Sequence, residues 1–410
     1  MKKLTFSFFL AVALSLLATA CKTEKLIEEP ALEITSDNVI EQLLAISEDS
    51  NHTRRKENTS ILWNYLQDSL SIPYVKNDTA LLLYYGEAQK VEWNGDFNSW
   101  SRDKSFSNDG KRIDSTDFWF LIKTFPSDSR LDYKITLNGS NWILDPNNPQ
   151  QQWSGFGPNS VLAMPDWKEE DVTKEDPNAL KGSISEKKTI QSNHLNYAVN
   201  YWVYQPNASF IQEQLPVMYV TDGHEYSDEK LGNMYTVLDN LISQNKIEPI
   251  LVVFIDPRNP SNTQENRRQE EYVVNEAYLF FVKNELQSTI KEVYGTTDQQ
   301  TAILGTSLGG LNASYFGAAA GDTFEYVAAQ SPAYWYNTRI FDLVQNASTL
   351  PKKVFVSAGT FNDGLENAQT MENIYKQQGV NLQMLVVNQG HSWGAWNQQL
   401  DNILLHFYGK

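Results

Sequence analysis

The stretch Leu304-Gly305-Thr306-Ser307-Leu308-Gly309-Gly310 decides how the second half of the chain folds. It contains the pattern Gly-x-Ser-x-Gly, with the apolar run 302–304 before it and a helical pattern over 311–320 after it. In a strand–turn–helix setting, the two glycines leave room for a sharp turn that raises the serine above a sheet. We therefore predict that Ser307 is a nucleophile. The alternative is a plain glycine-rich turn between a strand and a helix.

Strands alternate with helices on both sides of this stretch. Runs of apolar residues bounded by turn residues predict buried strands, and the intervening segments have helical periodicity. This alternation is typical of a doubly wound, mostly parallel sheet, which we place at residues 184–410. The predicted strands cover residues 197–204, 217–220, 250–255, 302–304, 326–329, 354–356 and 382–387.

A serine nucleophile needs an imidazole base, and only two histidines follow Ser307 in the chain. His391 comes directly after the predicted strand 382–387, at the edge where parallel strands end. His406 lies within the apolar pattern 403–407, where a packed or surface histidine is the simpler interpretation. We therefore predict that His391 is the base.

The acid that orients this base is expected after the strand 354–356, where two carboxylates are available. Asp363 lies in the turn before Gly364, from which a short side chain reaches the histidine. Glu366 begins the next helical pattern, where an acidic residue suits the helix dipole without any catalytic role. We favour Asp363 and keep Glu366 as the alternative.

Two backbone N–H groups are needed to stabilise an oxyanion at such a site. The first is predicted at Leu308, directly after the nucleophile. The second is predicted at His224, since Gly223 allows a close approach of the backbone after the strand 217–220. Whether the His224 side chain contacts a ligand or only borders the cleft stays open.

The first half of the chain has a different pattern. Helical periodicity appears at residues 36–46 and 60–70, and short strands of period two follow from residue 80. These strands predict a small all-β sandwich at residues 78–165, followed by a charged linker at residues 166–183. Its tryptophans either stack on sugars or pack in the core, and we favour the core. They are Trp93, Trp100, Trp119 and Trp142.

The first twenty-one residues have the pattern of a bacterial lipoprotein signal. Lys2 and Lys3 precede the apolar run 4–17, and small residues stand directly before Cys21. We predict a signal peptide at residues 1–20, a lipid on Cys21, and a segment of tether and helices at residues 21–77. The alternative is an ordinary secretory signal with a coincidental cysteine. We accordingly expect an exported lipoprotein of the cell envelope, held at a membrane by its acyl chains.

Composition excludes several classes of function. The 410 residues contain 50 Asp and Glu against 33 Lys and Arg, a net charge of −17 that disfavours binding to nucleic acid. A single cysteine excludes an intrachain disulfide and any zinc site built on several cysteines. Nothing in the sequence implies a metal or an organic cofactor, and the oligomeric state is left open.

Several segments of the second half carry a family resemblance. They resemble the esterase family of α/β-hydrolases that includes feruloyl esterases, acetyl-xylan-type esterases, S-formylglutathione hydrolases, mycolyltransferases and enterochelin esterases. The resemblance implies an α/β-hydrolase fold, with Ser307, Asp363 and His391 as catalytic triad. The segments are Thr221-Asp222-Gly223, residues 266–272, residues 305–310, Ser331-Pro332-Ala333-Tyr334-Trp335, residues 359–363 and residues 390–396.

Four motifs of the first half carry a second resemblance. They are similar to the immunoglobulin-like early-set module that precedes the catalytic domain in enterochelin esterases and in glycogen-branching-type enzymes. The motifs are residues 95–100, Phe118-Trp119, residues 130–134 and residues 144–149.

The resemblance implies a serine carboxylic-ester hydrolase that works through an acyl-enzyme. Because the chain is acidic and rich in aromatics, we expect a carbohydrate-linked ester of feruloyl or acetyl type, bound by Tyr334, Trp335 and Trp393. A siderophore trilactone is the alternative, since Arg268 with its neighbours could bind an anion unless it pairs with carboxylates. An acyltransferase and a non-catalytic binding lipoprotein are further alternatives.

Overall fold

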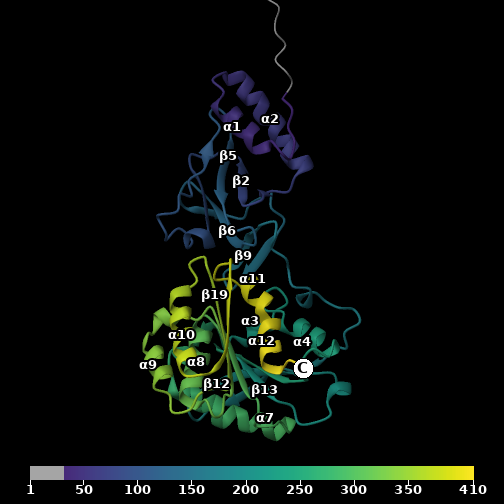
Figure 1. Ribbon diagram of the computed structural model, residues 1–410, viewed down its shortest axis with the longest axis vertical. Helices are drawn as coiled ribbons and strands as arrows, with labels where there is room; N and C mark the ends of the chain where they lie inside the picture. Colours follow the sequence, from purple (N-terminus) through teal and green to yellow (C-terminus); the bar gives the residue numbers. More distant parts are fainter. Residues whose placement is uncertain (1–31) are drawn as a thin grey trace, which may run out of the picture.

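The computed structural model describes residues 32–410, so the predicted signal peptide and Cys21 lie outside the described residues. Figure 1 shows three parts along the long axis: a helical pair, a β-sandwich and an α/β domain. The helical pair is α1 (Val39–Glu48) and α2 (His52–Ser69). Helix α2 begins earlier than its apolar pattern predicts, because the Asn51 side chain caps it by accepting hydrogen bonds from the backbone N–H groups of Thr53 and Arg54.

The β-sandwich consists of two antiparallel sheets. One has the order β1-β2-β5-β4, and the other has the order β3-β6-β9-β8 with β7 paired to β6. The strands are β1 (Tyr74–Lys76), β2 (Thr79–Tyr85), β3 (Val91–Gly95), β4 (Lys111–Arg112), β5 (Phe118–Thr124), β6 (Arg130–Leu137), β7 (Asn141–Ile143), β8 (Gln151–Ser154) and β9 (Gly157–Ala163). The relationship of this module to immunoglobulin-like modules stays a prediction.

Strand β2 is apolar on both of its faces for a structural reason. Ala80 and Leu82 point between the two sheets, where they pack with Trp93 and Leu131. Leu81 and Leu83 point to the opposite face, which α1 and α2 cover. The continuous apolar run of this strand therefore results from cover on both sides, and it fixes the helical pair to the sandwich.

The α/β domain is built on one large sheet of order β10-β12-β14-β13-β17-β18-β19-β20, with β11 paired to β12. All pairings from β14 to β20 are parallel, which confirms the predicted doubly wound, mostly parallel sheet. The strands are β10 (Ser183–Ile184), β11 (Lys188–Gln191), β12 (Ala198–Gln205), β13 (Val217–Val220), β14 (Leu251–Asp256), β17 (Ala302–Thr306), β18 (Tyr326–Gln330), β19 (Lys353–Gly359) and β20 (Asn381–Val387). A small hairpin joins β15 (Arg258–Asn259) to β16 (Asn262–Asn266).

Helices cover both faces of this sheet (Figure 1). Alternate strand residues pack against α7, α8, α9 and α10 on one face and against α4 and α12 on the other. The helices are α3 (Gly223–Tyr226), α4 (Met234–Ser243), α5 (Arg268–Tyr272), α6 (Glu276–Phe280), α7 (Gln287–Tyr294), α8 (Leu308–Ala320), α9 (Arg339–Gln345), α10 (Leu365–Gln377), α11 (Trp393–Trp396) and α12 (Leu400–Tyr408).

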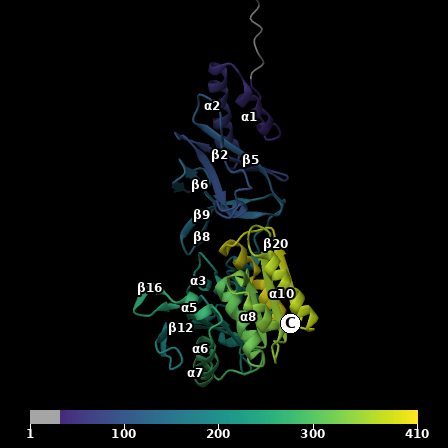
Figure 2. The ribbon, with the colours of Figure 1, turned by 90° about the vertical axis from the view of Figure 1, so that its left-hand side faces the viewer.

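The sandwich meets the α/β domain at the edge where its parallel strands end. Figure 2 shows β8 and β9 reaching from the sandwich toward this edge. Arg130 at the start of β6 forms a parallel β-bridge with Gln389, just after β20. The predicted linker 166–183 packs along α4, where the Asn240 amide donates to the carbonyls of Val172 and Lys174.

Candidate active site

Ser307 lies in the sharp turn between β17 and α8. Its backbone has φ of 58° and ψ of −118°, a strained conformation of the kind found at functional sites. A Cβ atom on Gly305 or Gly309 would lie 2.4 or 2.5 Å from the Thr221 hydroxyl. The loop after β13 therefore packs directly against this turn, and only glycine fits at both positions. The Ser307 side chain remains partly exposed.

Asp363 and His391 come together from the loops after β19 and β20. The Nδ1 atom of His391 lies 2.5 Å from the Oδ1 atom of Asp363. The Asp363 side chain is 1% exposed and the His391 side chain 41%, so the acid is buried and the imidazole reaches the surface. Glu366, the alternative acid, lies in the first turn of α10.

The second oxygen of Asp363 is held by two donors. Its Oδ2 atom accepts hydrogen bonds of 2.6 Å from the Ser331 hydroxyl and from the backbone N–H of Gly359. The Ser331 hydroxyl in turn accepts from Nε1 of Trp396, whose ring packs edge-on against His391 at 4.8 Å between centroids. Ser331 and Trp396 lie in segments that the family resemblance includes. Sequence reasoning gave Ser331 no role and considered Trp396 only as a residue that stacks on the substrate or packs.

Ser307 is tied to the same region through its backbone. Its N–H donates to the carbonyl of Gln330, and its carbonyl accepts from the N–H of Ala333, both at 2.9 Å. Within residues 32–410 the Ser307 hydroxyl makes no hydrogen bond, with His391 or any other group. Such bonds are often long in ligand-free enzymes and shorten in the substrate complex.

The two predicted oxyanion donors lie at the starts of helices. Leu308 is the first residue of α8, where backbone N–H groups have no partner within the helix. His224 lies in α3, one residue beyond Gly223. Asp222, directly before α3, has φ of 51°. Its carboxylate oxygens accept hydrogen bonds from Nε and Nη2 of Arg268 at 3.0 and 2.8 Å. Burial lowers the pKa of the His224 imidazole, which lies beside Asp256.

Three of the four predicted substrate contacts are instead used within the protein, which corrects the sequence interpretation. Tyr334 is buried, and its hydroxyl lies 2.7 Å from the Ser314 hydroxyl. Trp393 is buried edge-on against Tyr226, and Arg268 is bound to Asp222. Trp335, with 64% of its surface exposed, is the most accessible of the four.

A pocket of about 560 Å³ lies beside His391 and Asp363, between the α/β domain and the sandwich. Its aromatic lining comes from both parts, and Trp100 and Trp142 stack on each other with their centroids 6.4 Å apart. Trp93 and Trp119 are instead buried in the sandwich core. Ser307 does not itself line this pocket. The remaining lining includes Arg102, Lys134, Ser154, Phe156, Asn159, Ser331, Pro332, Trp335, Phe361 and Asn362.

Comparison with known proteins identifies the family. The model of the family described as "Putative esterase" matches residues 192–407, which is more than half of the chain. The chain belongs to this esterase family. Iron(III) enterobactin esterase of Escherichia coli strain K12 is 26% identical over 208 residues, which are 48% of this chain and 48% of that protein. The chain thus spans about half the length of the curated enterobactin esterases that it matches. The uncharacterized protein YbbA of Bacillus subtilis strain 168 is 23% identical over 210 residues, which are 48% of this chain and 79% of that protein.

The similarity to a solved structure covers more of this chain than the family match does. The enterobactin esterase FES from Shigella flexneri, crystallised in the presence of enterobactin, superposes with a TM-score of 0.66 at 19% identity. The superposition covers 80% of this chain and 92% of that chain, so the fold similarity extends beyond the α/β domain. Nine of the pocket residues lie in the sandwich, outside the range of the family match, and they include Trp100, Arg102, Lys134 and Trp142.

Proposed function

We propose that this protein is a serine carboxylic-ester hydrolase. The observation that carries the proposal is the 2.5 Å contact between His391 and Asp363, at the sheet edge where the strained turn of Ser307 also lies. With the Nδ1–H of His391 donated to Asp363, the Nε2 atom is left free to accept the proton of a serine hydroxyl. Membership of the esterase family supports the same chemistry.

The reaction proceeds in two steps. Ser307 attacks the ester carbonyl while His391 takes its proton, and the N–H groups of Leu308 and His224 stabilise the oxyanion. His391 then gives this proton to the leaving alcohol, and an acyl group remains on Ser307. Water, deprotonated by His391, attacks the acyl-enzyme, and His391 returns this proton to Ser307 as the acid leaves. Asp363 keeps the imidazole in the required tautomer throughout.

The aromatic pocket supports a substrate that carries planar rings. Trp100, Trp142 and Trp335 offer flat surfaces near His391, which suits a feruloyl group or the face of a sugar. We therefore propose a carbohydrate-linked ester of feruloyl type as one substrate class.

A catecholate trilactone is the second candidate, and a specific observation favours it. Arg268 and two nearby arginines are engaged elsewhere: Arg258 pairs with Asp256, Arg267 with Glu265, and Arg268 with Asp222. Two other cations, Arg102 and Lys134, line the pocket beside the tryptophans. Cations next to aromatic rings suit an anionic aromatic ligand, and two curated relatives are named iron(III) enterobactin esterases.

A panel of esters tests the proposal. We expect wild type to hydrolyse p-nitrophenyl acetate and Ser307→Ala to be inactive. Arg102→Gln and Lys134→Gln should each raise KM about tenfold for a catecholate trilactone if that is the substrate, the loss expected for one hydrogen bond to a charged group. The same variants should leave KM for a feruloylated sugar within about twofold, because the ferulate ester is neutral. Product analysis with added sugar acceptors distinguishes hydrolysis from acyl transfer.

We also propose that the protein is an exported, lipid-anchored lipoprotein. The proposal rests on the sequence of residues 1–21 alone. Among residues 32–410, no helix combines the length and apolarity needed to span a bilayer. Replacing Cys21 by serine should release the protein from membranes, which fractionation and mass spectrometry of the lipidated N-terminus would detect. Unchanged membrane association of the variant would contradict the lipid anchor.

A further inference from the structure

The sandwich contacts both loops that carry the proposed acid and base. The Asn362 amide, next to Asp363, donates to the backbone carbonyl of Asp96 at 3.1 Å. On the other loop, Gly390 packs so closely on Asp96 that a Cβ atom would lie 2.2 Å from its Cγ atom. One sandwich residue therefore touches the chain neighbour of the acid and the chain neighbour of the base.

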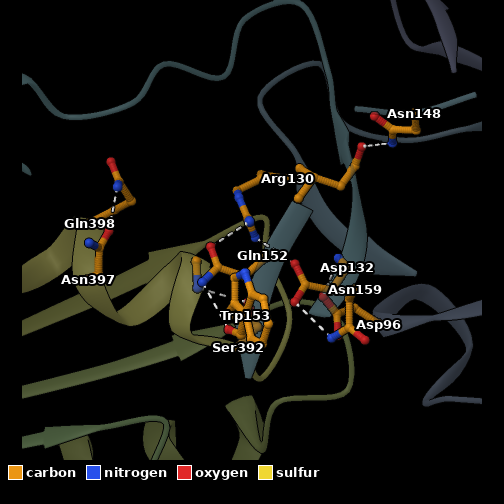
Figure 3. A network of polar contacts seen from close by, with 12 residues as sticks. Asp96, Arg130, Asp132, Asn148, Gln152, Trp153, Asn159, Ser392, Asn397 and Gln398 are labelled. Atoms are coloured by element: carbon orange, nitrogen blue, oxygen red, sulfur yellow. Dashed lines mark hydrogen bonds and ion pairs between the residues drawn. The ribbon is translucent and has the colours of Figure 1, made fainter. Parts of the chain in front are cut away.

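A buried ion pair of the sandwich lies against the His391 loop. Nη1 of Arg130 donates to Oδ1 of Asp132 at 2.8 Å, and the two side chains are 5% and 1% exposed. Burial raises the pKa of the Asp132 carboxyl, and the Ser392 hydroxyl, next to His391, is among the groups that oppose this rise. The Arg130 guanidinium lies on Gly394, where a Cβ atom would be 2.1 Å from Cζ. Figure 3 shows the hydrogen bonds of Arg130 with Gln152 and of Asp132 with Asn159.

Backbone contacts fix the beginning of the same loop. The N–H of Arg130 donates to the carbonyl of Asn388 at 3.3 Å, beside the bridge between Arg130 and Gln389. The Asn388 amide donates to the Asp128 carboxylate at 2.8 Å. Residues 388–394 are thus attached to the sandwich both before and after His391.

These contacts resist displacement of the loop. A buried ion pair adds little to overall stability, but an unpaired buried charge is costly. Asp132 accepts from Arg130 and Asn159, and the Arg130 guanidinium packs directly on Gly394, so moving the loop away uncovers this buried ion pair. The pair therefore favours one position of the loop and, with it, one position of the imidazole.

We propose that Arg130 and Asp132 are positioning residues for His391, which makes the sandwich part of the catalytic apparatus. This inference rests on the proposed function, in which His391 is the base. The α/β domain supplies the acid and the base, and the sandwich holds the loop that aligns them with Ser307.

The test compares Asp132→Ala with Asp145→Ala in the full-length protein. Asp145 is a matched control, because it is a buried aspartate of the same module whose carboxylate accepts hydrogen bonds from the Tyr133 hydroxyl and the Asn147 N–H, both within the sandwich. Turnover of p-nitrophenyl acetate, the melting temperature and the low-field proton resonance of the His391–Asp363 hydrogen bond are measured for each. Wild type and Ser307→Ala are measured alongside.

We expect Asp132→Ala to lower kcat by about 10- to 100-fold with KM within about twofold, the scale of a small misplacement of a catalytic group. Its low-field resonance should broaden or vanish, whereas Asp145→Ala should keep both kcat and the resonance despite a lower melting temperature. Asp132→Asn, which retains an oxygen acceptor for Arg130, should recover part of kcat.

Wild-type kcat and an intact resonance in Asp132→Ala, or equal losses in Asp145→Ala, would overturn the inference. If Asp132→Ala does not fold, Gln152→Ala replaces it, since Gln152 accepts from Arg130 near the surface and a smaller loss of the same kind is expected. Equal activity of wild type and Ser307→Ala would instead refute the proposed function, and the resonance would still report on the loop.

Discussion

The Oγ atom of Ser331 lies 2.6 Å from the Oδ2 atom of Asp363, on the side of the carboxylate that faces away from His391. This contact gives each carboxylate oxygen a separate role. Oδ1 receives the imidazole N–H, while Oδ2 is fixed by Ser331 and by the backbone of Gly359. The carboxylate is therefore oriented before any substrate binds, and His391 is oriented with it.

Ser331→Ala should lower kcat by about tenfold. The variant removes one of two donors to Oδ2 and leaves the buried Nε1 of Trp396 without its acceptor, at a cost of about 1–3 kcal/mol. Steady-state kinetics and thermal melting measure the two effects. Ser357→Ala is the control, since this buried serine bonds to Gln399 and not to Asp363. If both variants lose stability but neither loses turnover, the orienting role of Ser331 is wrong.

Asp363→Asn should lower kcat by about 10²- to 10⁴-fold, because an amide cannot hold the imidazole in the required tautomer. Glu366→Gln should change kcat by less than about twofold, since a charge at a helix start contributes mainly to helix stability. Steady-state kinetics of both variants decide between the two acids. The opposite pattern would assign the acid to Glu366.

Local patterns predicted the elements that position the site. The strand–turn–helix pattern around Ser307 and the positions of Asp363 and His391 after strands follow from short stretches of sequence. Ser331 and Trp396 could not be found in this way, because their contacts depend on how three separate loops meet. Helix α2 was predicted too short because its first half is polar, and only its cap at Asn51 marks where it begins.

The substrate contacts were harder to predict, for a physical reason. An aromatic residue near a strand end packs in the core or faces a ligand depending on the direction of its side chain, which composition does not reveal. Tyr334 and Trp393 turned out to be buried, and Trp335 exposed. In the sandwich, Trp93 points into the core, whereas Trp142 on the short strand β7 faces the pocket.

Trp142→Ala should raise KM for a feruloylated sugar by about three- to tenfold with little change in kcat, the scale expected for one lost aromatic contact. KM for a small acetyl ester should change less. Trp153→Ala is the matched control, because this tryptophan is similarly exposed but packs against Lys230 outside the pocket lining. Michaelis constants that rise equally in both variants would show that the pair Trp100–Trp142 is not a ligand platform.

Asp96→Asn should make the free energy of unfolding depend less on pH between about 4 and 8. Burial, and next the charge of Asp132, raise the pKa of Asp96 from 3.8 to about 8, while Arg130 and the Trp100 N–H partly oppose this. The folded state therefore holds a proton that the unfolded state has lost, so stability falls as pH rises from about 4 to 8. The fall is at most about 1.4 kcal/mol per pH unit.

Melting temperatures of wild type and Asp96→Asn at pH 5, 7 and 9 check this prediction. The asparagine has no proton to lose, so the melting temperature of the variant should rise relative to that of wild type as pH rises. The expected difference is about 2–4 °C for each kcal/mol of difference in the free energy of unfolding. Parallel melting curves across this range would mean that Asp96 does not hold the proton.

The most direct test of the whole account is covalent labelling of Ser307. The full-length protein is treated with a fluorophosphonate, and the modified peptide is identified by mass spectrometry, with Ser307→Ala as control. We predict one label per chain, located on Ser307, together with complete loss of ester hydrolysis and no label on the variant. An unlabelled Ser307, or a labelled enzyme that still hydrolyses esters, would contradict the assignment of Ser307 as nucleophile.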